Sequence, residues 1–144
     1  MSSLRRSDIV NRAVAQVLQT PWIPIAPGNE YLGCEGIVQL DTGVVFSISA
    51  KNYFEDNIEH LDLRKTKTIP FDFGTQETCV GETIQEVLLS ESWCPFSLGL
   101  LLSSKRVFCI NNSPWSSGPI LVDEAWYRSH GALVFWDHKP FVRP

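Results

Sequence analysis

Residues 36–48 read Gly-Ile-Val-Gln-Leu-Asp-Thr-Gly-Val-Val-Phe-Ser-Ile, and this stretch predicts a β-hairpin. Two apolar, β-branched runs flank Asp41-Thr42-Gly43, whose glycine can adopt the positive φ angle that a tight hairpin turn requires. In the second run Val44, Phe46 and Ile48 occupy every second position, as in a strand with one face on the core. The centre of the chain is therefore expected to be β-sheet.

The same pattern recurs later in the chain. Residues 37–49 align without a gap on residues 99–111, and both segments consist of a strand, a polar turn and a strand. They share the pattern Val-Phe-x-Ile, and Tyr31 and Trp93 fall in the same register. We expect two similar β-hairpins and consider a duplication, although two apolar strand pairs also align in this way by chance.

Other segments extend the predicted sheet. Strand-like runs cover residues 61–68, 83–89 and 98–102, and residues 120–127 and 132–136 are expected to pair with each other. The first of these runs alternates leucine with charged residues, as an exposed edge strand does.

The N-terminal segment predicts a helix. Apolar residues between Ser7 and Leu18 recur at helical spacing, Ser7 can cap the first turn, and Pro21 can end the helix. Prolines then predict an extended connector, in which Trp22 and Ile23 are expected to be buried. The predicted fold class is α+β: an N-terminal amphipathic helix followed by a mainly antiparallel sheet, with closure into a barrel left open, in a single domain over residues 1–144.

Composition limits the classes of partner. The chain has 144 residues, 44% of them apolar, and 16 acidic against 12 basic residues give a net charge of −4. A negative protein repels phosphate backbones, and Arg64, Lys65 and Lys67 are more typical of a solvated edge than of a nucleic-acid site. We expect no nucleic-acid binding, no membrane insertion, and a monomer or small homo-oligomer.

The four cysteines lack the spacing of a zinc site. Cys34, Cys79, Cys94 and Cys109 are far apart in apolar surroundings, which is typical of buried free thiols. The number of cysteines would allow two disulfides, which form in oxidising compartments. However, no apolar export signal follows the paired arginines near the N-terminus. A cytoplasmic location is the expectation.

The search for catalytic chemistry identified no motif. His60, His130 and His138 are scattered, and Asp137-His138 with a serine or Cys94 would make a triad only if the fold united them. Phosphate-binding glycine loops and the Gly-x-Ser-x-Gly elbow are absent from the sequence. We predict no catalytic, cofactor-binding or metal-binding residue, and the sequence favours a protein that is not an enzyme.

Two features point to binding of another protein. Glu55, Asp56, Glu59 and Asp62 form an acidic cluster that would attract a basic partner, and Trp115 in a flexible loop could anchor an interface. The opposing interpretations are a solvated acidic loop and a tryptophan that folds back over the core.

The predicted function is therefore a non-catalytic, intracellular protein-binding module. Immunity proteins, which neutralise toxins that are often basic nucleases, are one class of small acidic protein of this kind. Two alternatives stay open: a β-barrel that binds a small apolar ligand, and a small hydrolase with its site near His130 and His138.

Overall fold

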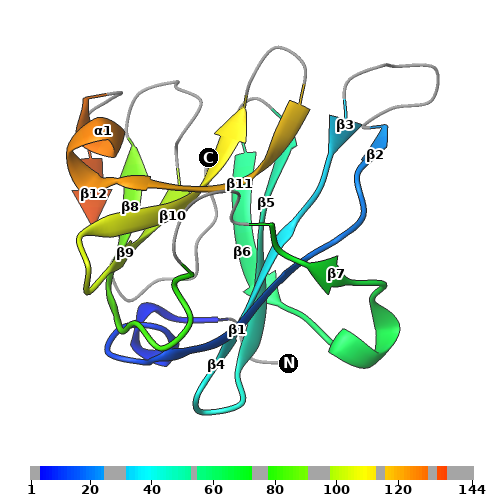
Figure 1. Ribbon diagram of the computed structural model, residues 1–144, viewed down its shortest axis with the longest axis horizontal. Helices are drawn as coiled ribbons and strands as arrows, with labels where there is room; N and C mark the ends of the chain where they lie inside the picture. The colour runs from blue at the N-terminus through cyan, green and yellow to red at the C-terminus, as the bar shows by residue number, and fades with distance from the viewer. Residues whose placement is uncertain are drawn as a thin grey trace.

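The computed structural model describes residues 4–24, 32–52, 55–72, 78–90, 98–112, 116–129 and 133–135 (Figure 1). Almost all of the regular structure in these residues is β-strand. The one α-helix, α1, spans only Glu124–Arg128, and two short 3-10 turns, η1 and η2, span Arg6–Asp8 and Leu63–Lys65. The protein is all-β in its described part, so the predicted α+β class is wrong.

The strands form two sheets. The five-stranded sheet has the order β6-β5-β4-β1-β7, and the seven-stranded sheet has the order β12-β8-β9-β10-β11-β3-β2. Within the described residues the sheets do not close into a barrel, which corrects the barrel-like architecture considered from the sequence. The strands are β1 Val14–Gln19, β2 Ile23–Pro24, β3 Leu32–Gly33, β4 Gly36–Leu40, β5 Val45–Asn52, β6 Glu55–His60, β7 Ile69–Pro70, β8 Ile84–Ser90, β9 Leu98–Leu102, β10 Arg106–Asn112, β11 Ser116–Asp123 and β12 Leu133–Phe135.

The predicted N-terminal helix is instead η1, a turn and β1. Asn11 has a φ of +67°, which no helix interior allows, and β1 pairs antiparallel with β4. A β-bulge between Val14 and Gln16 adds one residue to the strand, so that the buried Val14 and Val17 are three positions apart. This bulge gives a strand the apolar spacing of a helix, which explains the wrong prediction.

The two predicted hairpins are present and are parts of a larger repeat. β4 and β5 form the first hairpin, and β9 and β10 form the second. Each hairpin turn contains one residue with positive φ, Gly43 at +91° and Lys105 at +69°. In both turns this residue donates its backbone N–H to the last residue of the preceding strand, Leu40 O or Leu102 O.

The repeat extends to five strands on each side. β6-β5-β4-β1-β7 and β11-β10-β9-β8-β12 follow the same spatial order, with strands taken in the same sequence along the chain. The bulge of β1 recurs in β8 between Ile84 and Glu86. The fifth strand returns to the first in both cases, since Leu18 pairs with Pro70 and Leu88 pairs with Phe135.

Reciprocal hydrogen bonds join the two repeats. Asn11 N–H donates to Ile84 O and Gly81 N–H donates to Val14 O, both at 2.7 Å. Val14 N–H donates to Glu82 O and Ile84 N–H donates to Arg12 O, both at 2.9 Å. Ala13 and Thr83 pair across this junction in an isolated antiparallel bridge. The contacts are those of two similar units related by an approximate twofold axis through the bridge.

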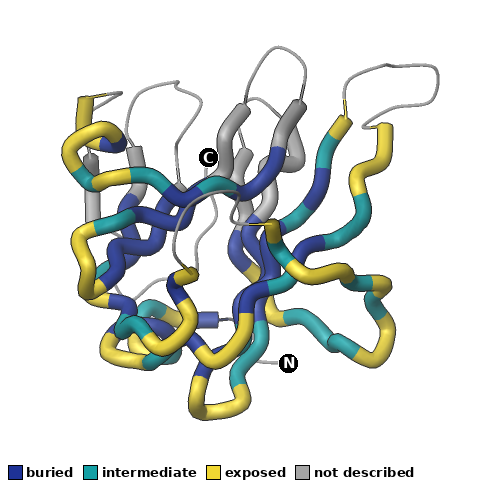
Figure 2. Tube along the Cα trace, in the orientation of Figure 1, coloured by how far each residue is buried: buried dark blue, intermediate teal, exposed yellow. Residues whose placement is uncertain are grey.

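One core is shared by both repeats. Figure 2 shows buried residues along the strands of both sheets. The largest buried cluster includes Phe46, Ile48 and Ile58 from the first repeat and Ile84 and Phe108 from the second. Burial of this apolar surface holds the two sheets together.

Three further predictions need correction. Residues 61–68 are not an edge strand but contain η2, with Arg64 and Lys65 exposed on that turn. Residues 124–127 form part of α1, and β12 pairs with β8 rather than with β11. The proline connector is held in place as β2 against β3, yet its apolar side chains Trp22 and Ile23 are 45% and 61% exposed, so their predicted burial is wrong.

No helix among the described residues has the length and apolar character needed to span a membrane.

Candidate functional site

The predicted acidic cluster falls mainly on one strand, β6. β5 and β6 pair antiparallel, with Ile48 opposite Ile58 and Ser47 opposite Glu59. Ile58 is 5% exposed and packs in the shared core, whereas Glu59 and His60 are exposed. The core contact of Ile58 therefore fixes the strand, which contains Glu55, Asp56 and Glu59.

β6 is the terminal strand of its sheet. An edge strand presents backbone N–H and C=O groups that have no partner within the sheet. Hydrogen-bonded and non-hydrogen-bonded pairs alternate along an antiparallel ladder. Leu61 N–H donates to Val45 O, so the ladder places the backbone N–H groups of Asp56, Ile58 and His60 on the side away from β5.

Asp62 has a different role from the other members of the cluster. Its side chain caps η2 by accepting the backbone N–H of Arg64 at 3.0 Å, and it also forms an ion pair with the Arg64 guanidinium. These hydrogen bonds from Arg64 lower the pKa of Asp62. The charge of Asp62 is therefore matched within its own turn.

Trp115 lies outside the described residues, and its predicted role as an anchor stays a prediction. His130, His138, Asp137 and Cys94 lie outside them as well. The residues that the sequence singled out are therefore brought together only in part: three acidic residues share β6, and Asp62 follows that strand by two positions.

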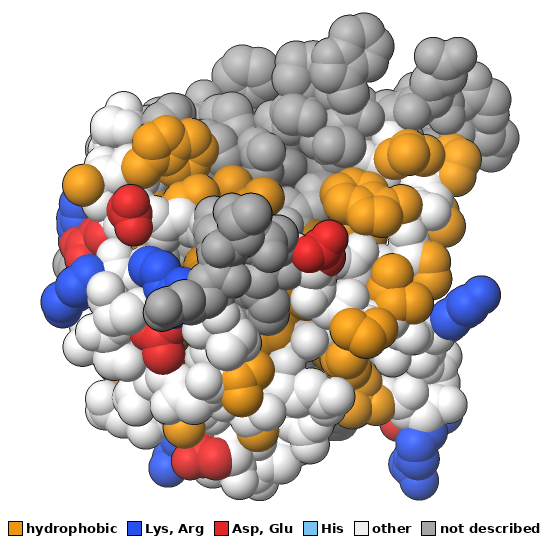
Figure 3. Space-filling model, viewed as in Figure 1, with side chains coloured by type: hydrophobic (Ala, Val, Ile, Leu, Met, Phe, Trp, Pro, Cys, Tyr) orange, Lys and Arg blue, Asp and Glu red, His pale blue; other side chains and the backbone are white. Residues whose placement is uncertain are grey.

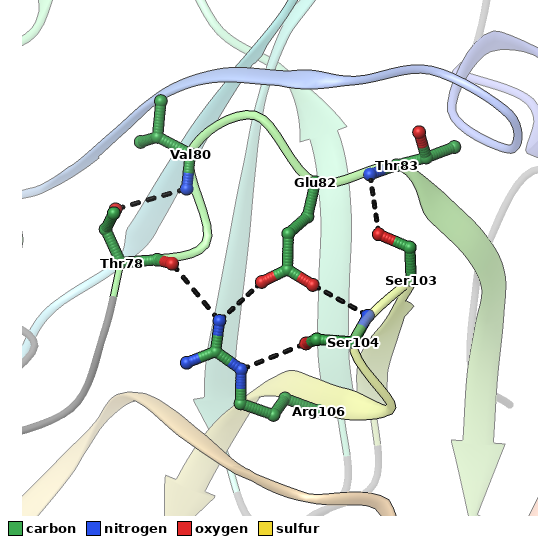
Figure 4. A network of polar contacts seen from close by, with 7 residues as sticks. All are labelled: Thr78, Val80, Glu82, Thr83, Ser103, Ser104 and Arg106. Carbon is green, nitrogen blue, oxygen red and sulfur yellow. Dashed lines mark hydrogen bonds and ion pairs between the residues drawn. The ribbon is translucent and has the colours of Figure 1, made fainter.

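A partly buried ion-pair network ties together two turns of the second repeat (Figure 4). The Glu82 carboxylate accepts hydrogen bonds from the Ser104 backbone N–H at 2.8 Å and from the Arg106 guanidinium. Arg106 also donates to Thr78 O at 3.1 Å and to Ser104 Oγ at 3.0 Å. Although partial burial opposes ionisation, the hydrogen bonds from Ser104 and Arg106 keep the pKa of Glu82 below its usual value.

This network is suited to holding the fold and not to proton transfer. A lowered pKa keeps Glu82 ionised at neutral pH, and its two oxygens are engaged by Ser104 and Arg106. Arg6 and Glu86 form a second, bidentate ion pair, with Nε–Oε1 and Nη2–Oε2 distances of 2.6 and 2.5 Å. It connects the N-terminal turn to the bulge of β8.

No protein-family model, curated protein or solved structure matches this chain.

The described cysteines have the character of core residues. Cys34, Cys79 and Cys109 are all buried, as the sequence predicts. Burial, with a smaller effect of Glu35, raises the pKa of Cys34 to about 12, and burial raises that of Cys79 to about 11. Thiols with such pKa values are poor nucleophiles at neutral pH. Among the described residues, His, Cys, Asp and Glu nowhere form a group of three that could hold a metal ion.

An exposed apolar surface was missed by the sequence analysis. Figure 3 shows hydrophobic side chains on the side of the molecule formed by β2, β3 and β7. Its most exposed members are Trp22, Ile23, Leu32 and Ile69, between 38% and 61% exposed. A signal for this surface is present in the sequence, where Ile is followed by Pro at residues 23–24 and 69–70. Proline restricts these two strands to two residues each at a sheet edge.

Proposed function

We propose that this chain is a non-catalytic protein-binding module of the cytoplasm that presents β6 to a basic region of another protein. The position of β6 at the edge of its sheet carries the proposal, because no strand among the described residues pairs with its outer side and the strand contains three acidic residues. An exposed edge favours contact with another chain, and acidic residues on it select a partner of opposite charge.

Two carboxylates of the second repeat agree with binding rather than catalysis. Glu82 and Glu86 are the partly buried carboxylates of β8 and its preceding turn, and both are in ion pairs with arginine. The small-ligand alternative was formulated for a barrel, and the described strands form two sheets instead. An immunity-type role fits the proposal, with a basic toxin such as a nuclease as the class of partner.

The test begins with a pull-down from the native cell, followed by binding measurements with the purified partner. Replacing Glu55, Asp56 and Glu59 with lysine is expected to weaken the complex at least ~10-fold at ~50 mM salt. The difference should shrink at ~500 mM salt, because the Debye length falls from about 10 Å at 0.1 M to about 3 Å at 1 M.

A matched control reverses three exposed acidic residues outside β6, Asp41→Lys, Asp72→Lys and Asp123→Lys. It should leave the affinity close to that of the unmodified protein. A confirmed complex that is equally insensitive to the β6 reversals at low salt would show that β6 is not the interface. In that case the acidic residues act only to keep the edge strand from pairing with other chains.

A further inference from the structure

The repeat allows β6 to be compared with its counterpart in the same molecule. β6 pairs with β5 as β11 pairs with β10, and both are the fourth strand of their repeat. In the aligned hairpins Phe46 matches Phe108, so the registers Phe46↔His60 and Phe108↔Leu121 match His60 with Leu121. Counting back along both strands matches Glu55 with Ser116 and Asp56 with Ser117.

The outer edge of β11 is already occupied by an extended segment of the chain itself. β3 adds to it in parallel, with Ser116 opposite Leu32 and Ser117 opposite Gly33. This segment belongs to the connector between β1 and β4 and is continued by β2 at the sheet edge. In the part of the chain that the structure describes, β6 has no strand at the equivalent edge.

At the matched positions, the outer edge of β6, which pairs with no strand among the described residues, has one N–H donor more than the occupied edge of β11. The ladder directs the N–H groups of Asp56, Ile58 and His60 outward. The residue of β11 that matches Ile58 is Pro119, which has no N–H group. An added strand can therefore accept more main-chain hydrogen bonds from β6 than β3 can accept from the matched positions of β11.

We infer that the partner of this protein binds by parallel addition of an extended, basic segment to β6, beginning at Glu55 and Asp56. This inference rests on the proposed function and specifies its mode of binding. The main-chain hydrogen bonds of the added strand hold it in register, as the contacts of β3 do on β11. Lysine or arginine side chains of the segment match the acidic residues of β6.

The first experiment uses the peptide acetyl-Lys-Val-Lys-Val-Lys-Val-amide as the probe and the full chain labelled with ¹⁵N. Binding is expected to shift and protect the amide resonances of Asp56, Ile58 and His60. A nitroxide at the peptide N-terminus should broaden Asp56 more than His60, and one at the C-terminus should do the reverse. The opposite pattern would overturn the parallel orientation, and no shift in β6 at millimolar peptide would overturn strand addition.

The matched control peptide has the same sequence with N-methyl groups on alternate residues, which keeps its charge but blocks its backbone donors. Its affinity is expected to be at least ~10-fold lower, because two or three hydrogen bonds are lost. Equal binding of both peptides would show that charge alone attracts them. That result would overturn strand addition and leave the proposed acidic interface intact.

A pair of variants makes the same distinction on the protein. Asp56→Pro and Asp56→Asn both remove the charge, but only proline removes the outward N–H, and the ladder with β5 does not use that group. We expect the proline variant to bind the peptide at least ~10-fold more weakly than the asparagine variant. Equal affinities would overturn strand addition. If Asp56→Pro does not fold, the pair His60→Pro and His60→Ala tests another outward N–H in the same way.

Discussion

Replacing Glu82 with glutamine is expected to destabilise the protein by about 1–2 kcal/mol at pH 7. A hydrogen bond to a charged group contributes roughly 1.5–3 kcal/mol, and Glu82 accepts from Ser104 and Arg106. Glutamine retains one acceptor, and Arg106 keeps its contacts with Thr78 and Ser104, so we take the lower part of the range. The side chains of Glu82 and Arg106 are 15% and 19% exposed, which limits screening by water.

The repeat supplies the control for this substitution. Arg12 occupies the position in the first repeat that Glu82 occupies in the second, and its backbone oxygen makes the equivalent bond across the junction. The Arg12 side chain is exposed, so Arg12→Gln is expected to change the free energy of unfolding by no more than about 0.5 kcal/mol. Urea denaturation of both variants gives the two values.

The pH dependence of the same variant tests the cause. The folded-state pKa of Glu82 is lowered, and an unfolded glutamate has a pKa of about 4.3. Its stabilising effect is therefore complete above that value and is lost as the pH falls through the lower, folded-state pKa. The free-energy difference between Glu82→Gln and the unmodified protein should shrink from pH 7 to pH 3. A difference that stays constant, or a Glu82→Gln variant as stable as Arg12→Gln, would refute the ion-pair explanation.

Three other outcomes follow from the fold. Gly43→Ala should cost about 1 kcal/mol or more, and Lys105→Gly should be neutral or stabilising by up to about 1 kcal/mol, because both positions have positive φ; opposite signs in urea titrations support the turn geometry. Ile58→Ala should cost about 2–5 kcal/mol and Glu59→Ala less than about 0.5 kcal/mol; similar costs would contradict the placement of β6. Cys34, with a pKa of about 12, should resist a disulfide reagent at pH 8 until urea unfolds the protein; rapid modification of the native chain would show that it is accessible.

The hairpins were predictable because their signals are local. Alternating apolar residues and a glycine at a turn specify two adjacent strands within residues 36–48, and β8, β9 and β10 follow from similar runs. The burial of Phe46 and Ile48 follows from the same alternation. Recurrence of the hairpin was also visible in the sequence, since matching residues occupy matching positions.

The first strand of each repeat shows where local patterns fail. A bulge changes the spacing of the buried Val14 and Val17 from two to three, and the buried Ile9 and Val10 lie in the turn before the strand. Together these positions mimic a helical period over residues 7–18. Pairing with β4 and β7 and reciprocal bonds to the second repeat stabilise β1 as a strand. The intrinsic preference of a short amphipathic segment for helix is weak compared with these long-range contacts.

The candidate site likewise has one part that the sequence predicts and one part that only the tertiary structure determines. The sequence alone predicted an acidic cluster with Glu55, Asp56 and Glu59, and a basic partner for it. Their place on an outermost strand depends on which strands pair across the whole chain, and so does the exposure of Trp22 and Ile23 beside another sheet edge. The charge and the turn preference of a segment depend on neighbouring residues and can be predicted from the sequence. Which strand lies at the edge of a sheet depends on hydrogen bonding between segments that are distant in the chain, so only the tertiary structure determines it.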